Sequence, residues 1–535
     1  MKKIPIIFIM FLTMYCSGIY AQVNQEWVAT FSGTGFGNFT ASKNATDKSG
    51  NLIVAGRAEL YSTDYLVLKY NPSGNLLWSN TYDGNSNGTD FLRDMILDDS
   101  GNVYVTGNSR EIEGAYNWVT IKYNYEGILI WKKSLDWTLH KEDVPFSITL
   151  DKDRNVLVAG YCWALPDGLQ NFDIVTAKYN NDGEELWTRS YNSKAFHADW
   201  GYSVVTDDSC NAYVSGYAYF RNIVTIKYSK DGNQIWVKEY PRMSGEFAIP
   251  LYSKIDKLNN IIVNGYYQVA GQSNFVTLKY NRDGNQIWDR IFDSPIGASD
   301  YAHSLFIDDS SNVYIGGSTF GMFFNDFLLI KYSPAGDTLL LRTYDGGVNQ
   351  TDVGNSIIVD TNLDIYLTGR SYIKSDNFLT IKYSKSGEIL WLKKYIQQNN
   401  NIPYSICLDQ NNSIFVSGSN VLGINSYVLL TIKYSQLTDI KNTYSEISSD
   451  FILYNYPNPF NPETDIKYTL NRSGNLKIEV FDIQGKSIKL LIDENKKPGN
   501  YKLKFNGSNL LSGIYFCTLE LNGIRLKTIK LLLLK

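Results

Sequence analysis

The sequence predicts an all-β chain: an eight-bladed β-propeller of four-stranded blades, followed by a small Ig-like β-sandwich. Three observations support this prediction. A Lys-Tyr pair recurs eight times at intervals of 49 to 56 residues. A segment of the type "NVYVTG" recurs eight times with the same period. The last 85 residues lack this repeat and instead contain strand-like segments separated by Gly, Asn and Pro turns.

Each period contains four short segments in which apolar residues alternate, which is the pattern of half-buried β-strands. Examples are "SITLD", "VYVTG", "VTIKY" and "QIWVKEY", separated by turns such as "DDSGN" and by Asp-Gly turns. Four antiparallel strands per repeat are typical of a propeller blade. The repeated aromatic residues are therefore expected to pack between blades and not to bind ligand. The tyrosines of the Lys-Tyr pairs are Tyr70, Tyr123, Tyr179, Tyr228, Tyr280, Tyr332, Tyr383 and Tyr434.

The two ends of the repeat array predict how the ring closes. After Tyr434 the pattern stops without its fourth strand, whereas "EWVATF" near the N-terminus places Trp27 and Phe31 at the spacing of Trp236 and Tyr240. The first strand is therefore expected to complete the last blade, which removes an exposed sheet edge. The predicted propeller covers residues 22–436.

These repeats resemble a known family of bacterial repeats. The segments "DDSGNVYVTG", "FLTIKY" and "GEILW" are similar to the SBBP β-propeller repeat, over about 410 residues. The resemblance implies a secreted or surface propeller and supplies no agreed catalytic residues. That family is associated with seven blades, so the eight predicted here depart from it.

The N-terminal sequence and the composition indicate where the protein is located and which partners are not expected. Residues 1–21 contain two lysines, an apolar run from Ile4 and a small residue at Ala21, which predict a cleaved secretory signal peptide. A lipoprotein signal at Cys16 is the alternative, but bulky Tyr15 precedes that cysteine where a small residue is needed. No later stretch has the roughly 20 apolar residues of a membrane span. The net charge of -4 gives no basic footprint for nucleic acid.

The C-terminal segment, residues 451–535 after a polar linker at 437–450, carries a second resemblance. Its motifs are "YPNPF" (Tyr456, Pro457, Asn458, Pro459 and Phe460), then "VFDIQGK", "PGNY" and "SGIYF". They resemble the type A C-terminal sorting domain of the type IX secretion system; an ordinary β-sandwich module is the alternative. The resemblance implies the type IX machinery as partner, and a protein secreted by, or on the outer-membrane surface of, a Bacteroidetes-like Gram-negative bacterium.

Candidate ligand-binding residues lie in the long, variable loops, because rigid repeat scaffolds usually bind through such loops. Aromatic residues there would stack on sugar rings or pack against a partner; the alternative is that they only cover the ends of the blades. The ligand-binding candidates are Trp137, His140, Trp163, His197, Trp200, His303 and Phe323.

One acidic position recurs eight residues before the turn aspartate of the repeat. It holds Asp90, Asp143, Asp199, Asp300 and Asp352. Several carboxylates near the channel mouth would suit Ca²⁺, which prefers oxygen ligands. Recurrence in most blades favours a structural role over a metal site, and no other cofactor is expected.

The material for catalysis is thin. The chain has three histidines, and no Gly-x-Ser-x-Gly, phosphate-loop or His-Glu-x-x-His motif. We therefore expect a binding or adhesion protein whose ligand the sequence does not name. The alternatives are an extracellular polysaccharide hydrolase or lyase that uses the channel-mouth carboxylates, and a structural surface-layer component.

Overall fold

The computed structural model describes residues 23–436 and 453–535, apart from 34–36, 60–61, 85–87, 113–114, 138–140, 165–171, 194–197, 219–221, 241–246, 270, 295–298, 322–323, 347–349, 373–374, 398–399, 424–425, 471, 484 and 523. The chain divides into two compact units, Met1–Leu437 and Thr438–Lys535. All elements assigned in the described residues are β-strands. Among these residues no helix has the length and apolarity needed to cross a membrane.

The described residues of the first unit form eight four-stranded antiparallel sheets, numbered here along the chain. The innermost strands of sheets 1 to 8 are β2 (Asn38–Thr46), β6 (Phe91–Leu97), β10 (Asp143–Leu150), β14 (Trp200–Thr206), β18 (Phe247–Ile255), β22 (Tyr301–Ile307), β26 (Asp352–Val359) and β30 (Asn401–Leu408). The second strands are β3 (Leu52–Glu59), β7 (Val103–Ile112), β11 (Val156–Trp163), β15 (Ala212–Ala218), β19 (Ile261–Val269), β23 (Val313–Phe320), β27 (Ile365–Tyr372) and β31 (Ile414–Gly423).

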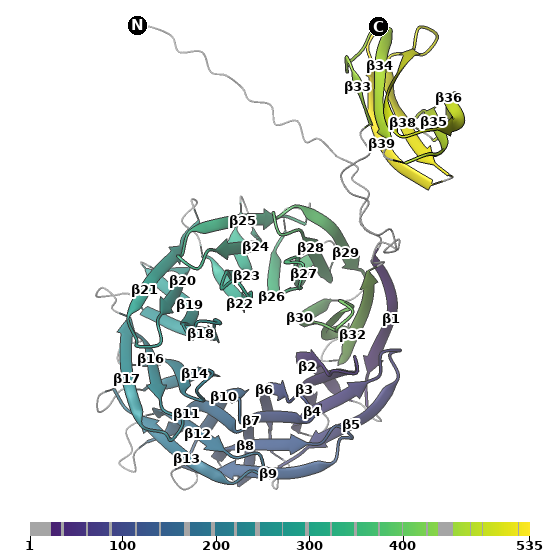
Figure 1. The fold of residues 1–535 in the computed structure, drawn as a ribbon. Helices are drawn as coiled ribbons and strands as arrows, with labels where there is room; N and C mark the ends of the chain where they lie inside the picture. Colours follow the sequence, from purple (N-terminus) through teal and green to yellow (C-terminus); the bar gives the residue numbers. More distant parts are fainter. Residues whose placement is uncertain are drawn as a thin grey trace, which may run out of the picture. The chain divides into compact units, whose positions relative to one another are not determined.

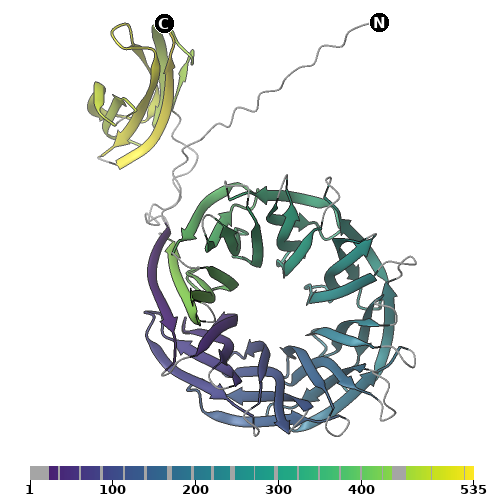
Figure 2. The same ribbon diagram turned by 180° about the vertical axis from the view of Figure 1, so that it is seen from behind.

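The third strands are β4 (Thr63–Tyr70), β8 (Ala115–Tyr123), β12 (Phe172–Tyr179), β16 (Asn222–Tyr228), β20 (Gln272–Tyr280), β24 (Asn325–Tyr332), β28 (Asp376–Tyr383) and β32 (Ser426–Gln436). The outermost strands are β5 (Leu76–Tyr82), β9 (Leu129–Leu135), β13 (Glu185–Tyr191), β17 (Gln234–Tyr240), β21 (Gln286–Phe292), β25 (Thr338–Tyr344), β29 (Ile389–Tyr395) and, for sheet 8, β1 (Val23–Phe31). Figures 1 and 2 show the sheets following one another around a common axis, the arrangement of a β-propeller; we call the region around this axis, bordered by the innermost strands, the channel.

The N-terminal strand belongs to the last sheet, as the spacing of Trp27 and Phe31 predicts. β1 pairs antiparallel with β32, with Trp27 opposite Lys433 and Phe31 opposite Leu429. The same sheet then packs against sheet 1, since Trp27 and Phe31 join the hydrophobic cluster around Leu52, Val54 and Leu68.

Among the described residues, a tryptophan–lysine clamp joins neighbouring sheets at six of the eight junctions. In sheet 3, for example, the indole N–H of Trp187 and the ammonium of Lys178 both donate to the carbonyl of Lys230, in a turn of sheet 4 (2.9 and 3.2 Å). At the last junction the indole of Trp27 and the ammonium of Lys433 donate to the carbonyl of Pro72 in sheet 1, both at 3.0 Å. Sheet 6 has Leu340 in place of the tryptophan, and in sheet 7 Lys382 donates instead to the side chain of Gln436 at 2.6 Å.

The glycine of each Asp-Gly type turn is required by this packing. Gly183 has φ +83, a conformation that L residues rarely adopt, and a Cβ there would lie 2.8 Å from the indole of Trp131 in the preceding sheet. The near-identical hairpins therefore recur because each must accept a large side chain of the preceding sheet, a tryptophan in all but the turn at Gly387, which accepts Leu340.

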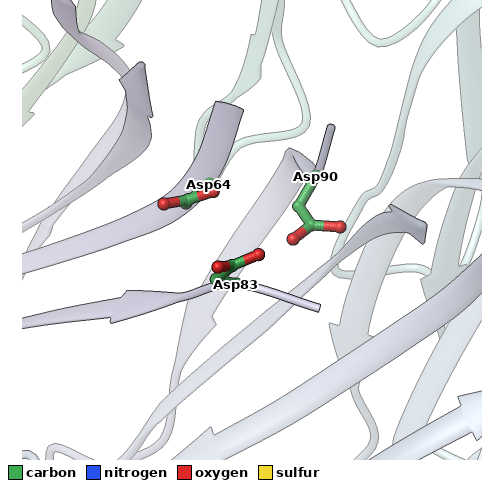
Figure 3. Close-up of side chains that lie close together, drawn as sticks. All are labelled: Asp64, Asp83 and Asp90. Carbon is green, nitrogen blue, oxygen red and sulfur yellow. The ribbon is translucent and has the colours of Figure 1, made fainter. Parts of the chain in front are cut away.

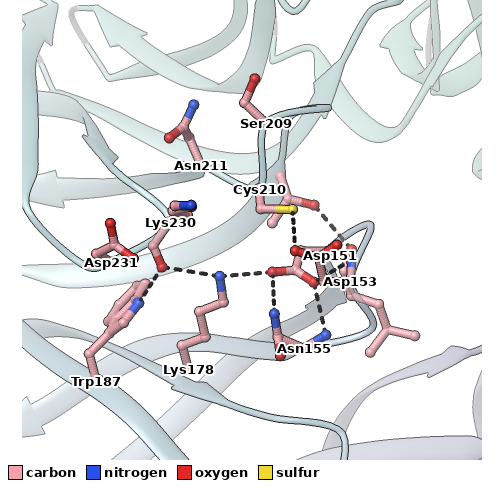
Figure 4. A network of polar contacts seen from close by, with 12 residues as sticks. Asp151, Asp153, Asn155, Lys178, Trp187, Ser209, Cys210, Asn211, Lys230 and Asp231 are labelled. Atoms are coloured by element: carbon pink, nitrogen blue, oxygen red, sulfur yellow. Dashed lines mark hydrogen bonds and ion pairs between the residues drawn. The ribbon is translucent and has the colours of Figure 1, made fainter.

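The turn aspartates lie at the same end of the sheets as the clamp turns, because the clamp lysine contacts both: Lys178 bonds to Asp151 of its own sheet and to the Lys230 carbonyl of the next. Asp151 accepts the backbone N–H groups of Asp153 and Asn155 on Oδ1 (2.9 and 2.8 Å), and the Asn155 amide on Oδ2 (2.9 Å). Lys178 forms an ion pair with the same Oδ2 at 2.8 Å (Figure 4). Both side chains are at most 2% exposed, so the pair is held inside the sheet junction.

This buried network has two versions in sheets 1 to 7, whereas sheet 8 has Phe415 at this level of its second strand, with Lys433 over its ring. Where the second strand carries an aliphatic residue at this level, as Leu157 does in sheet 3, lysine and aspartate lie 2.8 to 3.0 Å apart. Where it carries tyrosine, as Tyr213 does in sheet 4, the phenol donates to Asp207 at 3.0 Å. Lys227 then lies 3.7 Å from Asp207 and over the Tyr213 ring, 4.8 Å from its centroid.

The second unit consists of two sheets that share one core. One contains β33 (Leu453–Tyr456), β34 (Glu463–Leu470) and β37 (Gly499–Asn506). The other contains β35 (Gly474–Phe481), β36 (Ser487–Lys496), β38 (Gly513–Leu521) and β39 (Ile524–Leu533). Buried Ile466 and Phe505 of the first sheet belong to the same cluster as Leu476, Cys517 and Leu531 of the second.

Candidate binding site in the central channel

The five candidate metal-binding aspartates are buried at sheet junctions and anchor loops. None is more than 1% exposed. In every case one carboxylate oxygen accepts a backbone N–H from six residues earlier, at 2.6 to 2.9 Å. The donors to Asp90, Asp143, Asp199, Asp300 and Asp352 are Gly84, Trp137, Ser193, Ser294 and Gly346 respectively. Burial raises the pKa of Asp143 to about 7.

At two of these junctions the aspartate belongs to a three-carboxylate cluster. Asp90 lies with Asp64 of β4 and Asp83, which follows β5 (Figure 3). Asp352 lies in the same way with Asp326 and Asp345, and one oxygen from each residue lies within 4.8 Å of the others in both clusters. Burial, followed by the charges of Asp345 and Asp352, raises the pKa of Asp326 to about 6.

The sequence reasoning missed the partners in these clusters, although a signal was available. Asp64 and Asp326 stand five residues before the repeat lysines Lys69 and Lys331. The corresponding residue in sheet 2 is Asn117, and at the junction of sheets 3 and 4 Asn192 takes the place of Asp83 and donates to Asp173 at 2.8 Å. An acidic cluster of this kind accommodates either a hard cation or shared protons.

The channel wall is built by a β-bulge at the same place in every innermost strand. The register between the first and second strands shifts by one residue in all eight sheets, which leaves one extra residue unpaired in each inner strand. We call these residues the bulge ring: Ser42, Arg93, Phe146, Tyr202, Leu251, His303, Asn355 and Tyr404. None of them is fully buried.

The residue after the bulge fixes neighbouring inner strands to one another. Ser147 accepts the backbone N–H of Val204 at 3.2 Å, and Ser304 accepts that of Ile357 at 3.1 Å. Ser405 accepts the N–H of Asn44 at 3.1 Å, so the same bond joins sheet 8 to sheet 1. Bonds of this kind join six of the eight neighbouring pairs of inner strands and help to hold the bulge residues in place.

Aromatic side chains concentrate on the channel side of sheets 3 and 4. The rings of Phe146 and Tyr202, successive members of the bulge ring, lie 4.9 Å apart. Behind them, Trp200 stacks on Tyr161 at 4.5 Å and on Tyr217 at 5.5 Å. We call these five residues the aromatic wall. The indole of Trp200 is thus held between two rings, while Phe146 and Tyr202 remain half-buried.

Charged residues from three sheets share the channel with this wall. Lys43 of sheet 1 forms an ion pair with Asp94 of sheet 2 at 3.3 Å. Asp94 is the main reason that the pKa of Lys43 is raised. Burial, followed by the positive charge of Lys43, lowers the pKa of Lys254 in sheet 5, while Asp94 opposes that shift. These residues of sheets 1, 2 and 5 therefore face a common space.

The predicted ligand-binding residues occupy different places. Trp200 belongs to the aromatic wall, and His303 to the bulge ring, where it stacks on Tyr301 at 6.1 Å and burial lowers its pKa to about 4. Trp163 packs edge-on against Phe172 at 5.2 Å. Trp137 lines a groove beside β9 and β13, with Lys133 and Glu185. His140, His197 and Phe323 lie outside the described residues.

The "YPNPF" motif of the second unit docks on the C-terminal strand. Phe460 is 2% exposed in the core, and its N–H donates to the carbonyl of Leu532 at 2.9 Å. Asn458 accepts the N–H of Leu532 and donates its amide to the Lys530 carbonyl, both at 2.8 Å. Tyr456, in contrast, is 72% exposed.

Comparison with known proteins identifies this second unit. Residues 455–533 match the model of the secretion system C-terminal sorting domain. This confirms the resemblance to the type IX sorting domain and indicates a secreted or cell-surface protein that uses the type IX secretion machinery. No curated protein matches the sequence.

Solved structures with similar folds share little sequence with this chain. A quinohemoprotein alcohol dehydrogenase from Pseudomonas putida HK5 is 10% identical, with a TM-score of 0.49, over 77% of this chain and 76% of that one. PorZ, a surface component of the type IX secretion system of Porphyromonas gingivalis, is 14% identical (TM-score 0.39, 93% and 70% covered). The β-propeller domain of the Trilobed protease from Pyrococcus furiosus is 9% identical (TM-score 0.40, 68% and 100% covered). At these TM-scores the similarities carry no information on ligand or activity.

Proposed function

We propose that this chain is a secreted or cell-surface binding protein whose eight sheets form a closed propeller of SBBP-type repeats, and that it binds an extracellular glycan at the aromatic wall. The observation that carries the binding proposal is the pair of half-buried rings, Phe146 and Tyr202, 4.9 Å apart on the innermost strands. Trp200, fixed between Tyr161 and Tyr217, keeps this surface rigid. Rigid aromatic surfaces bind flat apolar faces, such as those of sugar rings, at low entropic cost.

The junction between sheets 8 and 1 supports closure of the ring. The side-chain amide of Asn44 donates to the carbonyls of Ser405 and Phe415 (3.2 and 3.3 Å), and the Thr46 hydroxyl donates to the carbonyl of Leu408 at 2.7 Å. The Trp27–Lys433 clamp on Pro72 adds the same contacts that join sheets 1 to 6 to one another.

A polysaccharide hydrolase or lyase receives less support. Glycosidases commonly use two carboxyl groups that flank the substrate. Here the recurring aspartates are at most 1% exposed and are bonded to backbone N–H groups. The inner strands offer one carboxylate that is not buried, Asp94, and it is paired with Lys43.

A glycan array tests the proposal with the full chain and two variants, Phe146→Ala and Tyr202→Ala. We expect the wild type to retain at least one class of oligosaccharide and each variant to lose most of that signal. Tyr125→Ala is the matched control, because Tyr125 is 55% exposed in a turn at the outer end of sheet 2. Variants that fold and bind like the wild type would refute a site at the aromatic wall.

A further inference from the structure

The inner strands carry an excess of positive charge. Their cationic side chains are Lys43, Arg93 and Lys254, whereas the single carboxylate among them that is not buried is Asp94. Asp143 and Asp352 lie on inner strands as well, but both are buried at sheet junctions. Since Asp94 compensates Lys43 at 3.3 Å, Arg93 and Lys254 account for the excess.

Lys254 is an uncompensated cation in the channel. Its side chain is exposed, and among the described residues no carboxylate lies within ion-pair distance of it. The nearest charges that affect it are Lys43, which disfavours its protonation, and Asp94, which favours it. An anionic group placed beside Lys254 would relieve the repulsion from Lys43.

Arg93 is placed beside the aromatic wall. Its guanidinium lies over the rings of Phe91 and Phe146, 5.5 and 5.4 Å from their centroids. Its Nε donates to the Asn108 side chain at 2.9 Å, which orients the plane of the group. Guanidinium groups match the planar geometry of carboxylates and bind sulfates by the same paired N–H groups. Arg93 therefore presents an anion-binding group directly next to the ring of Phe146.

We propose that the channel selects an anionic polysaccharide, one with uronic acid or sulfate groups, whose sugar rings lie on Phe146 and Tyr202 and whose acidic groups contact Arg93 and Lys254. This proposal rests on the proposed glycan-binding function and narrows it to one ligand class. Stacked rings beside two cations that form no ion pair among the described residues distinguish the site from one for neutral glycans, which offer no anionic group to such cations.

The test compares polygalacturonate with its fully methyl-esterified form, because the two share a backbone and differ in charge. Binding is measured by isothermal titration with the full chain and with Arg93→Gln, Lys254→Gln and Lys257→Gln. Lys257 is the matched control: it is in the turn after β18 and already pairs with Asp309 at 2.9 Å. A dextran sulfate arm examines sulfate in place of carboxylate.

We expect an acidic polymer to bind and the ester to bind at least about tenfold more weakly. Arg93→Gln or Lys254→Gln should lower the affinity for the acidic polymer by about tenfold, which is the effect of one lost charge-assisted hydrogen bond. Lys257→Gln should bind like the wild type. Equal binding of acid and ester, or unchanged affinity in both channel variants, overturns the charge selection while leaving glycan binding intact. Failure of every glycan overturns the proposed function with it. If poly-L-glutamate binds as tightly as polygalacturonate, the channel recognises acidic chains in general and the polysaccharide assignment is wrong.

Discussion

Replacement of the clamp lysine by methionine should have different costs in different sheets. In sheet 3, Lys178→Met removes the cation that pairs with Asp151 at 2.8 Å, the one such partner among the described residues, and leaves this buried carboxylate with the amide of Asn155 at 2.9 Å and two backbone N–H groups. In sheet 4, Lys227→Met removes a cation 3.7 Å from Asp207, which keeps the phenol of Tyr213 at 3.0 Å and the amide of Asn211 at 2.9 Å. Both carboxylates therefore keep the amide of an asparagine, but only Asp207 also keeps a phenol as hydrogen-bond donor after the lysine is removed.

The expected magnitudes follow from these partners. Breaking a buried ion pair by removing one member costs about 3 to 5 kcal/mol, and we expect about 4 kcal/mol for Lys178→Met. Lys227→Met mainly loses the hydrogen bond to the Arg282 carbonyl (2.9 Å) and the contact with the Tyr213 ring. Such a charge-assisted bond contributes about 1.5 to 3 kcal/mol, so the two variants should differ by about 2 kcal/mol.

Guanidinium denaturation of the full chain, followed by tryptophan fluorescence, measures this difference. The observable is the midpoint of the first transition, because a ring of eight sheets need not unfold in two states. Lys257→Met serves as the control for loss of an exposed lysine, whose side chain is 63% exposed. Equal midpoints for Lys178→Met and Lys227→Met would refute the idea that the tyrosine substitutes for the lysine.

Three further outcomes follow from the described contacts. Burial raises the pKa of Asp143 to about 7, so the stability gained from its protonated form is complete below the unfolded pKa of 3.8 and is lost as pH rises through 7. Asp143→Asn should therefore remove up to about 4 kcal/mol of the pH dependence of stability, measured by thermal melts at several pH values. The same pH dependence in wild type and variant would contradict the raised pKa of Asp143. Gly183→Ala should lower the melting temperature more than Gly271→Ala, because both glycines have positive φ, +83 and +85, but a Cβ at Gly271 meets nothing within 4 Å; equal losses would mean that the contact with Trp131 has no effect. Trp27→Ala should speed amide hydrogen exchange in β2 and β32 more than in the other sheets, whereas an even increase around the ring would argue against a local role at the junction.

The sequence predicted the four-stranded sheets of the first unit well because each structural element of a sheet is repeated along the chain. The Lys-Tyr pairs and the turn aspartates recur in each sheet, so their period revealed the four-stranded unit, and the displaced copy of the fourth strand at Trp27 revealed its place in the last sheet. The "YPNPF" motif predicted the sorting domain because its residues have structural roles of their own. Phe460 and Asn458 both form hydrogen bonds with the backbone of β39.

The channel site was harder to predict because a bulge shifts the period by one residue. Strict alternation along "DWGYSVVTD" assigns Tyr202 and Val204 to the same face. The bulge between Gly201 and Ser203 separates them, so that Val204 is 2% exposed while Tyr202 remains half-buried. The sequence analysis selected Trp200 because it stands at the end of a long variable loop, and it did not select Tyr202, which lies within the strand. It also placed the recurring aspartates near the channel mouth and did not predict that they are buried.

The repeats within one chain also separate structural positions from functional ones. The clamp lysine is the same residue in all eight copies, and in six of them its ammonium donates to a carbonyl in a turn of the neighbouring sheet. The position after the bulge is serine in five copies for a similar reason, the bond to the next inner strand. The bulge position holds seven different residue types in eight copies, from Ser42 to Arg93 and Leu251, although its backbone is the same each time. The fold requires the bulge backbone in every sheet but does not require a particular side chain there. These side chains can therefore differ according to the ligand, and the bulge ring is the first place to test for binding.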